Sequence, residues 1–185
     1  MVMPDTARRY TLEEVLAFPE DGNRYELVDW ELLVTTAPAQ PHEIVLVRLV
    51  GYLHEYLAPF AAVAQMFFSR GDVIWGPEEY VQPDLFVVPR SEVTGDWRDC
   101  QHLLLSVEVV SPSSARGDRF KKRRLYQRRG VGTYWIVDAD AQLVEVWHPQ
   151  DERPEIVTDA LRWRVTPDAP ELRIELSPLF ANLPG

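Results

Sequence analysis

The sequence predicts a globular protein of the α/β (α+β) class, in which helices flank a central mixed β-sheet and extra β-hairpins extend it. The expected elements run in the order helix, several strands, helix, then strands, without a regular alternation of strand and helix. The hydrophobic content of 46% and the aromatic content of 11% are those of an ordinary folded protein. The length of 185 residues suits one domain, which we place at residues 1–185.

The first half of the chain is expected to form a helix, a hairpin and a second helix, at residues 6–18, 24–34 and 42–57. Thr11 and Glu14 form the capping box that is typical of a helix start. The hairpin is expected to turn at Asp29 and Trp30. Apolar residues recur with helical spacing in the long helix, and Pro59 ends it.

The rest of the chain is expected to be rich in strands, at residues 62–69, 72–75, 81–88, 103–110, 133–138, 142–148, 155–165 and 171–176. Pro83 indicates a strand start, an edge or a bulge, because proline has no N–H to donate. A basic helix is expected from Asp118, as its N-cap, to Gly130, which follows its last turn. The two strands that follow this helix form a hairpin. A helical turn is expected at residues 177–180.

Composition excludes several classes of protein. No run of about 18 apolar residues is present, so no membrane-spanning helix is expected. The N-terminal residues lack the apolar core of a secretory signal. The single cysteine, Cys100, excludes an internal disulfide and a zinc site built from cysteines. Together these features indicate a bacterial-type cytoplasmic protein.

Charge is unevenly distributed along the chain. The formal net charge of −10 argues against a protein that coats nucleic acid. Residues 111–130, however, hold eight of the 19 basic residues and one acid, Asp118. The remainder carries 11 basic and 28 acidic residues, a net charge of −17. The basic segment can contact a phosphate backbone, although a solvated helix face or a dimer contact explains its charge equally well.

Two acids interrupt strands that are otherwise apolar. Asp84 lies in the predicted strand 81–88, and Glu108 lies in the predicted strand 103–110. A buried carboxylate is costly unless a cation or hydrogen-bond donors meet it. If the strands are neighbours, both carboxylates can converge at one end of the sheet, where Mg²⁺ or Mn²⁺ is the natural ion between them. The alternative for each acid is an ion pair with an arginine at the end of its strand.

Lysine is rare in this chain and is confined to the basic helix. Of the 19 basic residues, 17 are arginines and two are lysines, Lys121 and Lys122, which favours a role that needs a compact charge with an adjustable pKa. On the expected helix, Lys122 shares one face with Asp118 and Tyr126 and can reach the carboxylates. There it can orient or deprotonate a water, or stabilise the transition state. Lys121 points about 100° away, toward solvent or phosphate. The alternative for Lys122 is a solvated ion pair with Asp118.

The order of these motifs resembles a known nuclease superfamily. Pro83-Asp84 and Glu108, followed by a lysine in the next helix, are similar to the PD-(D/E)XK motif, although Val110 occupies the position of the usual lysine. A narrower resemblance is to the Uma-type (Uma-two) family of bacterial restriction-endonuclease-like proteins. Its motifs match, in chain order, Tyr25–Asp29, His42, Gln82–Leu85, Val107–Ser113, Asp118 with Lys122 and Tyr126, Gly130–Val131, Tyr134–Trp135 and Val137–Asp138. Trp30 stands where that family usually has glycine.

The resemblance implies a restriction-endonuclease-like core and a metal-dependent endonuclease that hydrolyses DNA phosphodiester bonds with Mg²⁺ or Mn²⁺. It assigns the metal to Asp84, Glu108 and the main-chain carbonyl of Val109. It makes Lys122 the family's migrated catalytic lysine. It makes Glu26 an upstream acid that contacts a second metal or a water.

The resemblance, which covers about residues 10–180, adds weaker candidates. His42 is an accessory site residue, or a histidine bonded to a neighbouring acid. Tyr126 is an accessory hydroxyl near the lysine or phosphate, or a packing residue. Apart from the resemblance, the charge of the basic helix predicts nucleic-acid contacts at Arg119, Lys121 and Arg123.

DNA is the expected partner, and a homodimer is plausible because cleavage of two strands needs two sites. The main alternative is a nuclease-like fold without activity that serves as a nucleic-acid-binding or protein-interaction module. It is motivated by the acidic body and by the lack of a recognisable DNA-reading module. A hydrolase that acts on RNA or on a nucleotide is a further alternative.

Overall fold

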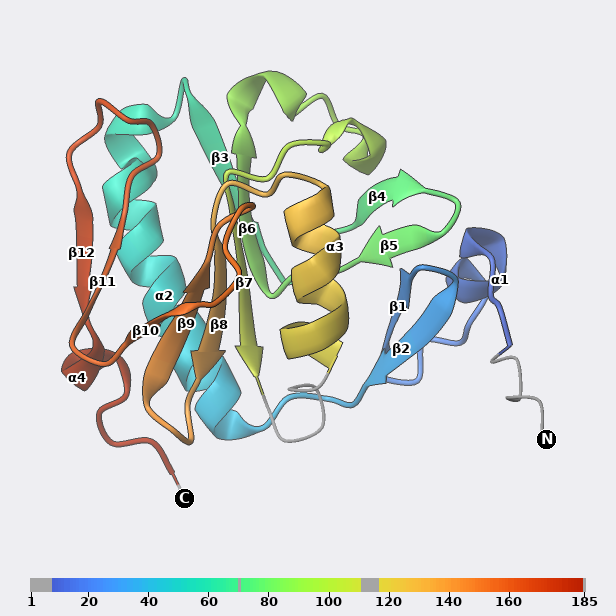
Figure 1. Ribbon diagram of the computed structural model, residues 1–185, viewed down its shortest axis with the longest axis horizontal. Coiled ribbons are helices and arrows are strands. Elements are labelled where there is room, and N and C mark those ends of the chain that lie inside the picture. Colours follow the sequence, from blue (N-terminus) through green and yellow to red (C-terminus); the bar gives the residue numbers. More distant parts are fainter. Residues whose placement is uncertain (1–7, 70, 111–116, 185) are drawn as a thin grey trace.

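The computed structural model describes residues 8–69, 71–110 and 117–184, apart from the side chain of Asp118. A six-stranded mixed sheet forms its centre, as predicted (Figure 1). Its strands are β3 (Ala64–Phe68), β6 (Leu85–Pro89), β7 (Leu105–Val110), β8 (Tyr134–Asp138), β9 (Leu143–Trp147) and β10 (Glu155–Val157). They lie in the order β10-β9-β8-β7-β6-β3, in which β7 and β8 run parallel and the other neighbours are antiparallel.

The long helix α2 (Gln40–Leu57) packs on one face of this sheet (Figure 1). Alternate residues of β7 point toward it, and they are Leu105, Val107 and Val109. The same core contains the hairpin of β11 (Ala160–Trp163) and β12 (Leu172–Glu175) and the short helix α4 (Leu176–Leu179). Burial of apolar side chains from the large sheet, from α2, and from the β11–β12 hairpin with α4 stabilises this half of the molecule.

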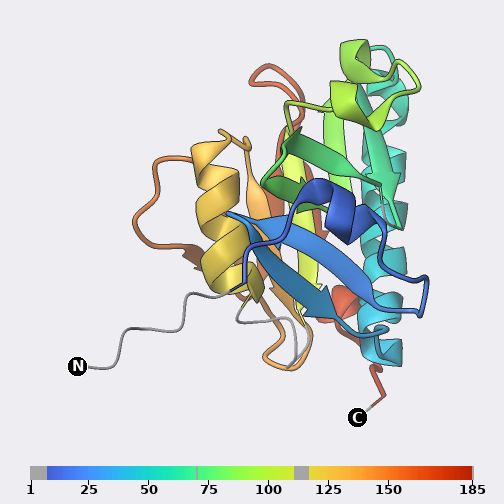
Figure 2. The same cartoon turned by 90° about the vertical axis from the view of Figure 1, so that its right-hand side faces the viewer.

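The basic helix and a smaller sheet cover the opposite face (Figure 2). The helix consists of a π-helical segment, η4 (Gly117–Lys122), followed by α3 (Arg123–Arg128). The smaller sheet has the order β2-β1-β5-β4, with the strands β1 (Arg24–Val28), β2 (Glu31–Thr35), β4 (Val73–Gly76) and β5 (Glu79–Val81). The remaining residues of β7 face this side, so Glu108 points away from α2. The large sheet is therefore covered on both faces.

Pro83 divides the predicted strand 81–88 into two. Its first residue ends β5 in the smaller sheet, and most of the rest forms β6 in the large sheet. Proline cannot donate to a strand ladder, so the chain changes sheets at this point. The predicted strand 155–165 is also divided, between β10 of the large sheet and β11 of the two-stranded sheet, with Thr158 and Asp159 at the break.

The residues predicted to begin and end the helices agree with the structure better than the predicted helix lengths do. The first helix, α1 (Leu12–Leu16), is shorter than predicted, but the capping box of Thr11 and Glu14 is confirmed. Gly130 has a φ of 68° and follows the last turn of α3, as predicted. The first part of the basic helix is π-helical and not α-helical, a variation that is frequent at functional sites. The predicted capping role of Asp118 concerns a side chain outside the described part of the structure.

The turn between β1 and β2 has a left-handed backbone conformation, although it contains no glycine. Asp29 and Trp30 have φ values of 52° and 67°. The backbone of Trp30 is bonded on both sides, since its N–H donates to Glu78 O and its carbonyl accepts from the N–H of Tyr10. These bonds stabilise a conformation that costs about 1–2 kcal/mol for a residue with a Cβ.

Short 3₁₀ helices occur at η1 (Ala58–Phe60), η2 (Arg90–Glu92) and η3 (Trp97–Asp99). Pro59 lies in η1, directly after α2, so the predicted end of the long helix is confirmed. Within the described ranges, no helix combines the length and the hydropathy that crossing a bilayer requires.

Candidate active site

The pairing of β6 with β7 brings Asp84 and Glu108 together. The two strands are antiparallel neighbours, and Leu85 pairs with Val107. One step further along the same register, Asp84 lies opposite Glu108. The prediction that these carboxylates meet at one end of the sheet is confirmed, and a shared arginine lies against both.

Asp84 is 2% exposed and is held by three groups. Arg24 donates from Nη2 to Oδ1 at 2.7 Å. The other oxygen, Oδ2, accepts from the N–H of Val109 at 2.8 Å and lies 3.1 Å from Nε2 of His42. The ion pair with an arginine, which was the alternative explanation for this acid, is therefore present. Val109 presents its N–H to Asp84, and a metal contact by its carbonyl stays a prediction.

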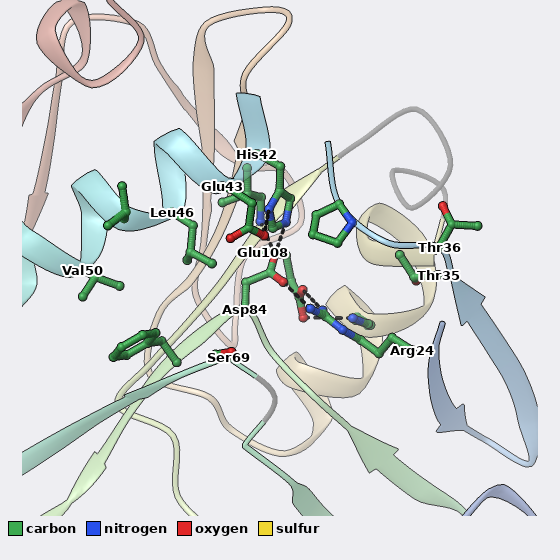
Figure 3. Close-up of a pocket in the computed structure, with 15 residues that line it drawn as sticks. Arg24, Thr35, Thr36, His42, Glu43, Leu46, Val50, Ser69, Asp84 and Glu108 are labelled. Atoms are coloured by element: carbon green, nitrogen blue, oxygen red, sulfur yellow. Dashed lines mark hydrogen bonds and ion pairs between the residues drawn. The ribbon is translucent and has the colours of Figure 1, made fainter. Parts of the chain in front are cut away.

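Glu108 is held by two side chains of the basic helix. Its Oε1 accepts hydrogen bonds from Nζ of Lys122 at 3.0 Å and from the hydroxyl of Tyr126 at 3.1 Å. Its Oε2 lies 3.7 Å from Nη1 of Arg24. The guanidinium of Arg24 thus lies between Oδ1 of Asp84 and Oε2 of Glu108 (Figure 3).

Lys122 is buried between two acids and is not a solvated lysine. Its side chain is 3% exposed, and Nζ forms an ion pair with Oε2 of Glu26 at 2.7 Å. Glu26 is fully buried, and its Oε1 accepts from the N–H of Gln82 at 2.8 Å. Glu26 therefore holds the lysine from the side opposite Glu108. Its predicted contact with a second metal or a water stays a prediction.

The charges of the cluster shift the pKa values of its members. Burial by itself raises the pKa of Asp84, but the hydrogen bond with His42 and the charge of Arg24 hold it well below its usual range. Burial lowers the pKa of His42, and the hydrogen bond with Asp84 outweighs this effect, so that the pKa is raised. Burial, and then the charge of Glu108, raise the pKa of Tyr126 well above its usual value. Tyr126 therefore keeps the proton that it donates to Glu108.

A cavity of about 360 Å³ opens onto this cluster (Figure 3). Its charged lining comprises Arg24, His42, Glu43, Asp84, Glu108 and Lys122. Its apolar lining includes Leu46, Val47 and Val50 of α2 and Phe68 of β3. Apolar walls with a few convergent polar groups are typical of sites for small molecules and for parts of larger ones.

The donors in this cavity fit Mg²⁺ or Mn²⁺ better than a metal that needs a full protein cage. Within the described ranges, no three His, Cys, Asp or Glu side chains are arranged to bind one ion. The buried carboxylates that face this cavity are those of Asp84 and Glu108. Mg²⁺ is commonly held by one or two carboxylates and keeps several waters. The facing oxygens already share a cation, Arg24, so the position between them suits positive charge.

The three basic residues that were predicted to contact nucleic acid have partners within the protein. Arg119 forms ion pairs with Asp138 at 2.6 Å and with Glu145 at 2.5 Å. Lys121 pairs with an acid of β2, and Arg123 lies over the tryptophan ring at the end of β9. Contact with DNA stays a prediction for these residues.

Arg24 is a site residue that sequence analysis missed. It lies two positions before Glu26 on β1, so the two side chains point to the same face of that strand. This alternation was the available signal. Its partner Asp84 is 60 positions away in the chain, and the pairing of the two depends on how the sheets pack.

Comparisons with known proteins agree with the fold and the motifs. A crystal structure of a "putative nuclease belonging to DUF820" from Anabaena variabilis ATCC 29413 matches with a TM-score of 0.76. It is 22% identical, and the match covers 93% of this chain and 98% of that chain. No curated protein matches the sequence. A sequence model of the Uma2 family, described as "Putative restriction endonuclease", matches residues 12–177. The chain therefore belongs to the Uma2 family, and its fold is restriction-endonuclease-like.

Proposed function

We propose that the protein is a metal-dependent endonuclease that hydrolyses DNA phosphodiester bonds with Mg²⁺ or Mn²⁺. The observation that carries the proposal is the buried set of Asp84, Glu108 and Lys122 beside one cavity. The description of the family and that of the solved structure both name a nuclease, which supports the same class of reaction.

Each site residue has a distinct part in this chemistry. Asp84 and Glu108 would hold the ion, which when bound activates a water and offsets the charge of the phosphate. Lys122 supplies a fixed positive charge beside Glu108 and can orient the attacking water. Glu26 is a positioning residue that holds the ammonium group, and Tyr126 fixes the orientation of Glu108.

The apolar wall of the cavity favours a nucleotide over a bare phosphate. Phe68 and Val47 line the cavity, and they are 52% and 65% exposed. Stacking of a base on an aromatic ring contributes about 1–3 kcal/mol. A base or sugar next to the cleaved phosphate can therefore cover this wall while the phosphate lies at the carboxylates.

The test is cleavage of plasmid and linear DNA by the purified protein with Mg²⁺, with Mn²⁺ and with a chelator. We expect Asp84→Asn, Glu108→Gln and Lys122→Arg each to lower the rate by about 100-fold or more, as loss of one acid–base or electrostatic group does. Glu55→Gln, an exposed change on α2, is the matched control and should cleave like the wild type.

The other outcomes are equally specific. Equal activity in all variants would place the cleavage in a contaminant or in another site. Cleavage of RNA or of small phosphodiesters, but not of DNA, would select the alternative hydrolase. No cleavage and no metal binding in calorimetry would leave a silent fold that serves as a binding module.

A further inference from the structure

We infer that Arg24 occupies the position of the divalent ion between Asp84 and Glu108, and that the ion binds by displacing it. The inference rests on the proposed function, because it concerns the same two carboxylates. It makes Arg24 a built-in competitor of the metal and not a further ligand.

The geometry of the oxygens carries this inference. Oδ2 of Asp84 and Oε1 of Glu108 are turned toward donors of the protein. The oxygens that face the guanidinium are Oδ1 of Asp84, at 2.7 Å from Nη2, and Oε2 of Glu108, at 3.7 Å from Nη1. A Mg²⁺ ion needs carboxylate oxygens at about 2.0–2.1 Å. An ion that used these two oxygens would overlap the guanidinium, so both cannot occupy the position at once.

The guanidinium cannot leave this position by losing its charge. The side chain of arginine stays protonated in proteins, and Arg24 lies against the carboxylates of Asp84 and Glu108. Arg24 is therefore a permanent cation that neutralises two buried carboxylates. To make room for a divalent ion, the side chain has to move.

The cavity provides the space for this movement. The side chain of Arg24 is 14% exposed and lines the cavity, whereas both acids are 2% exposed. Arg24 extends from β1 of the smaller sheet, whereas Asp84 directly precedes β6 and Glu108 lies in β7 of the large sheet (Figure 3). Its withdrawal therefore breaks two ion pairs and leaves the strand pairing of the large sheet intact.

Competition between Arg24 and the ion predicts an effect on metal affinity that differs from the effect of losing a residue that only supports the site. The apparent affinity for the ion is the intrinsic affinity multiplied by the fraction of molecules in which Arg24 is withdrawn. Removal of the guanidinium should then tighten metal binding, although it removes a residue of the site. A residue that merely supports the site would weaken metal binding when it is replaced.

The experiment is titration calorimetry with Mn²⁺ on the wild type, Arg24→Gln and Arg24→Lys. If Arg24 bridges the acids in about 90% of molecules, Arg24→Gln should bind Mn²⁺ about tenfold tighter. Arg24→Lys keeps the charge but loses the two-pronged fork, so a smaller increase is expected. Arg90→Gln removes the same charge at an exposed position where Arg90 contacts Gln65, and it should bind Mn²⁺ like the wild type.

Thermal unfolding supplies a second readout. Without metal, Arg24→Gln should melt at a lower temperature than the wild type, because two buried carboxylates lose their shared cation. With Mn²⁺, its melting temperature should rise by more than that of the wild type. If Arg24→Gln does not fold, Arg24→Lys carries the test, and equal or weaker binding by it overturns the inference.

The outcomes separate this inference from the proposed function. If the wild type binds Mn²⁺ and Arg24→Gln binds it equally or more weakly, Arg24 is not a competitor, while the metal site stands. If neither protein binds Mn²⁺, the metal site itself is wrong and the inference falls with it. If Arg24→Gln binds Mn²⁺ and the wild type does not, Arg24 keeps the site closed.

Discussion

Lys122 has a proposed role in activity and also contributes to the ion pairs of the protein interior. Its ammonium group lies between Glu26 and Glu108, and all three side chains are buried. The cost of desolvating such charges offsets much of their attraction, so the cluster is weak evidence of net stabilisation. Removal of one partner is different, because it leaves an uncompensated charge in the interior. A loss of activity on replacement of Lys122 is therefore informative only beside a measurement of stability.

We expect Lys122→Met to lower the free energy of unfolding by about 3–5 kcal/mol, since two buried carboxylates lose their cation. The measurement is unfolding in urea, followed by circular dichroism. Lys121→Met is the matched control, because this neighbour pairs with Glu31 and both side chains are largely exposed. Its cost should be below about 1 kcal/mol. Equal losses in the two variants would contradict a buried role for Lys122.

At the scale of elements, the connection between α3 and β8 places the basic helix over β7. The N–H of Gly132 donates to the carbonyl of Leu103 at 2.9 Å. A Cβ added at Gly132 would lie 2.8 Å from the carbonyl oxygen of Leu104. The connection therefore presses backbone against backbone, where neither side can yield as a flexible side chain would. This contact helps to hold Lys122 above Glu108.

We expect Gly132→Ala to destabilise the protein by about 1–3 kcal/mol, which is the usual cost of overpacking. Gly51→Ala should have the opposite sign and stabilise it by up to about 1 kcal/mol, because alanine favours a helix more than glycine does. Gly51 lies on the exposed side of α2, and a Cβ there would meet no atom within 4 Å. Thermal unfolding of both variants measures whether each substitution lowers or raises the stability. A neutral Gly132→Ala would show that the start of β7 can shift.

At the scale of the molecule, acids of both sheets pair with several arginines of the basic helix. Arg119 pairs with Asp138 and Glu145 of the large sheet, and Arg128 and Arg129 pair with Glu79 of the smaller sheet. Glu79 is 4% exposed, so it is a buried anchor for two arginines. The positive charge read from residues 111–130 therefore serves partly to attach the helix to both sheets. A phosphate backbone would have to compete with these ion pairs.

The ion pair of Arg119 with Asp138 makes the free energy of unfolding depend on pH. Burial raises the pKa of Asp138, but hydrogen bonds from the N–H of Ala141 and from Arg119 outweigh burial, and the pKa is lowered. A lowered folded-state pKa adds stability above the unfolded-state value of about 3.9, and this stability is lost as the pH falls through the folded-state value. We expect Asp138→Asn to remove part of the fall in unfolding free energy below about pH 4.

Urea midpoints of the wild type and of Asp138→Asn at pH 7 and at pH 3 measure this effect. The gap between the two proteins should be larger at pH 7 than at pH 3. An equal gap at both values would assign the acid sensitivity to other carboxylates.

Much of the candidate site could be read from the sequence, because its residues are exceptions to their surroundings. Asp84 and Glu108 are acids in apolar strands, and Lys122 is one of two lysines among 19 basic residues. The order of motifs was sufficient to identify the family, and the match over residues 12–177 confirms it. The central mixed sheet was also predictable, since β6, β7 and β8 are mostly apolar and β9 alternates around Glu145.

Packing decided the features that involve distant parts of the chain. Local periodicity did not show that Pro83 carries the chain from one sheet to the other, because both halves of that run are apolar. It also did not show that Arg24 lies between Asp84 and Glu108. Two strands can be recognised from their own residues, whereas the charge that one strand places against another depends on how their sheets stack. From the sequence, either a metal between the acids or an ion pair of each acid with an arginine was expected, and packing places Arg24 against both acids.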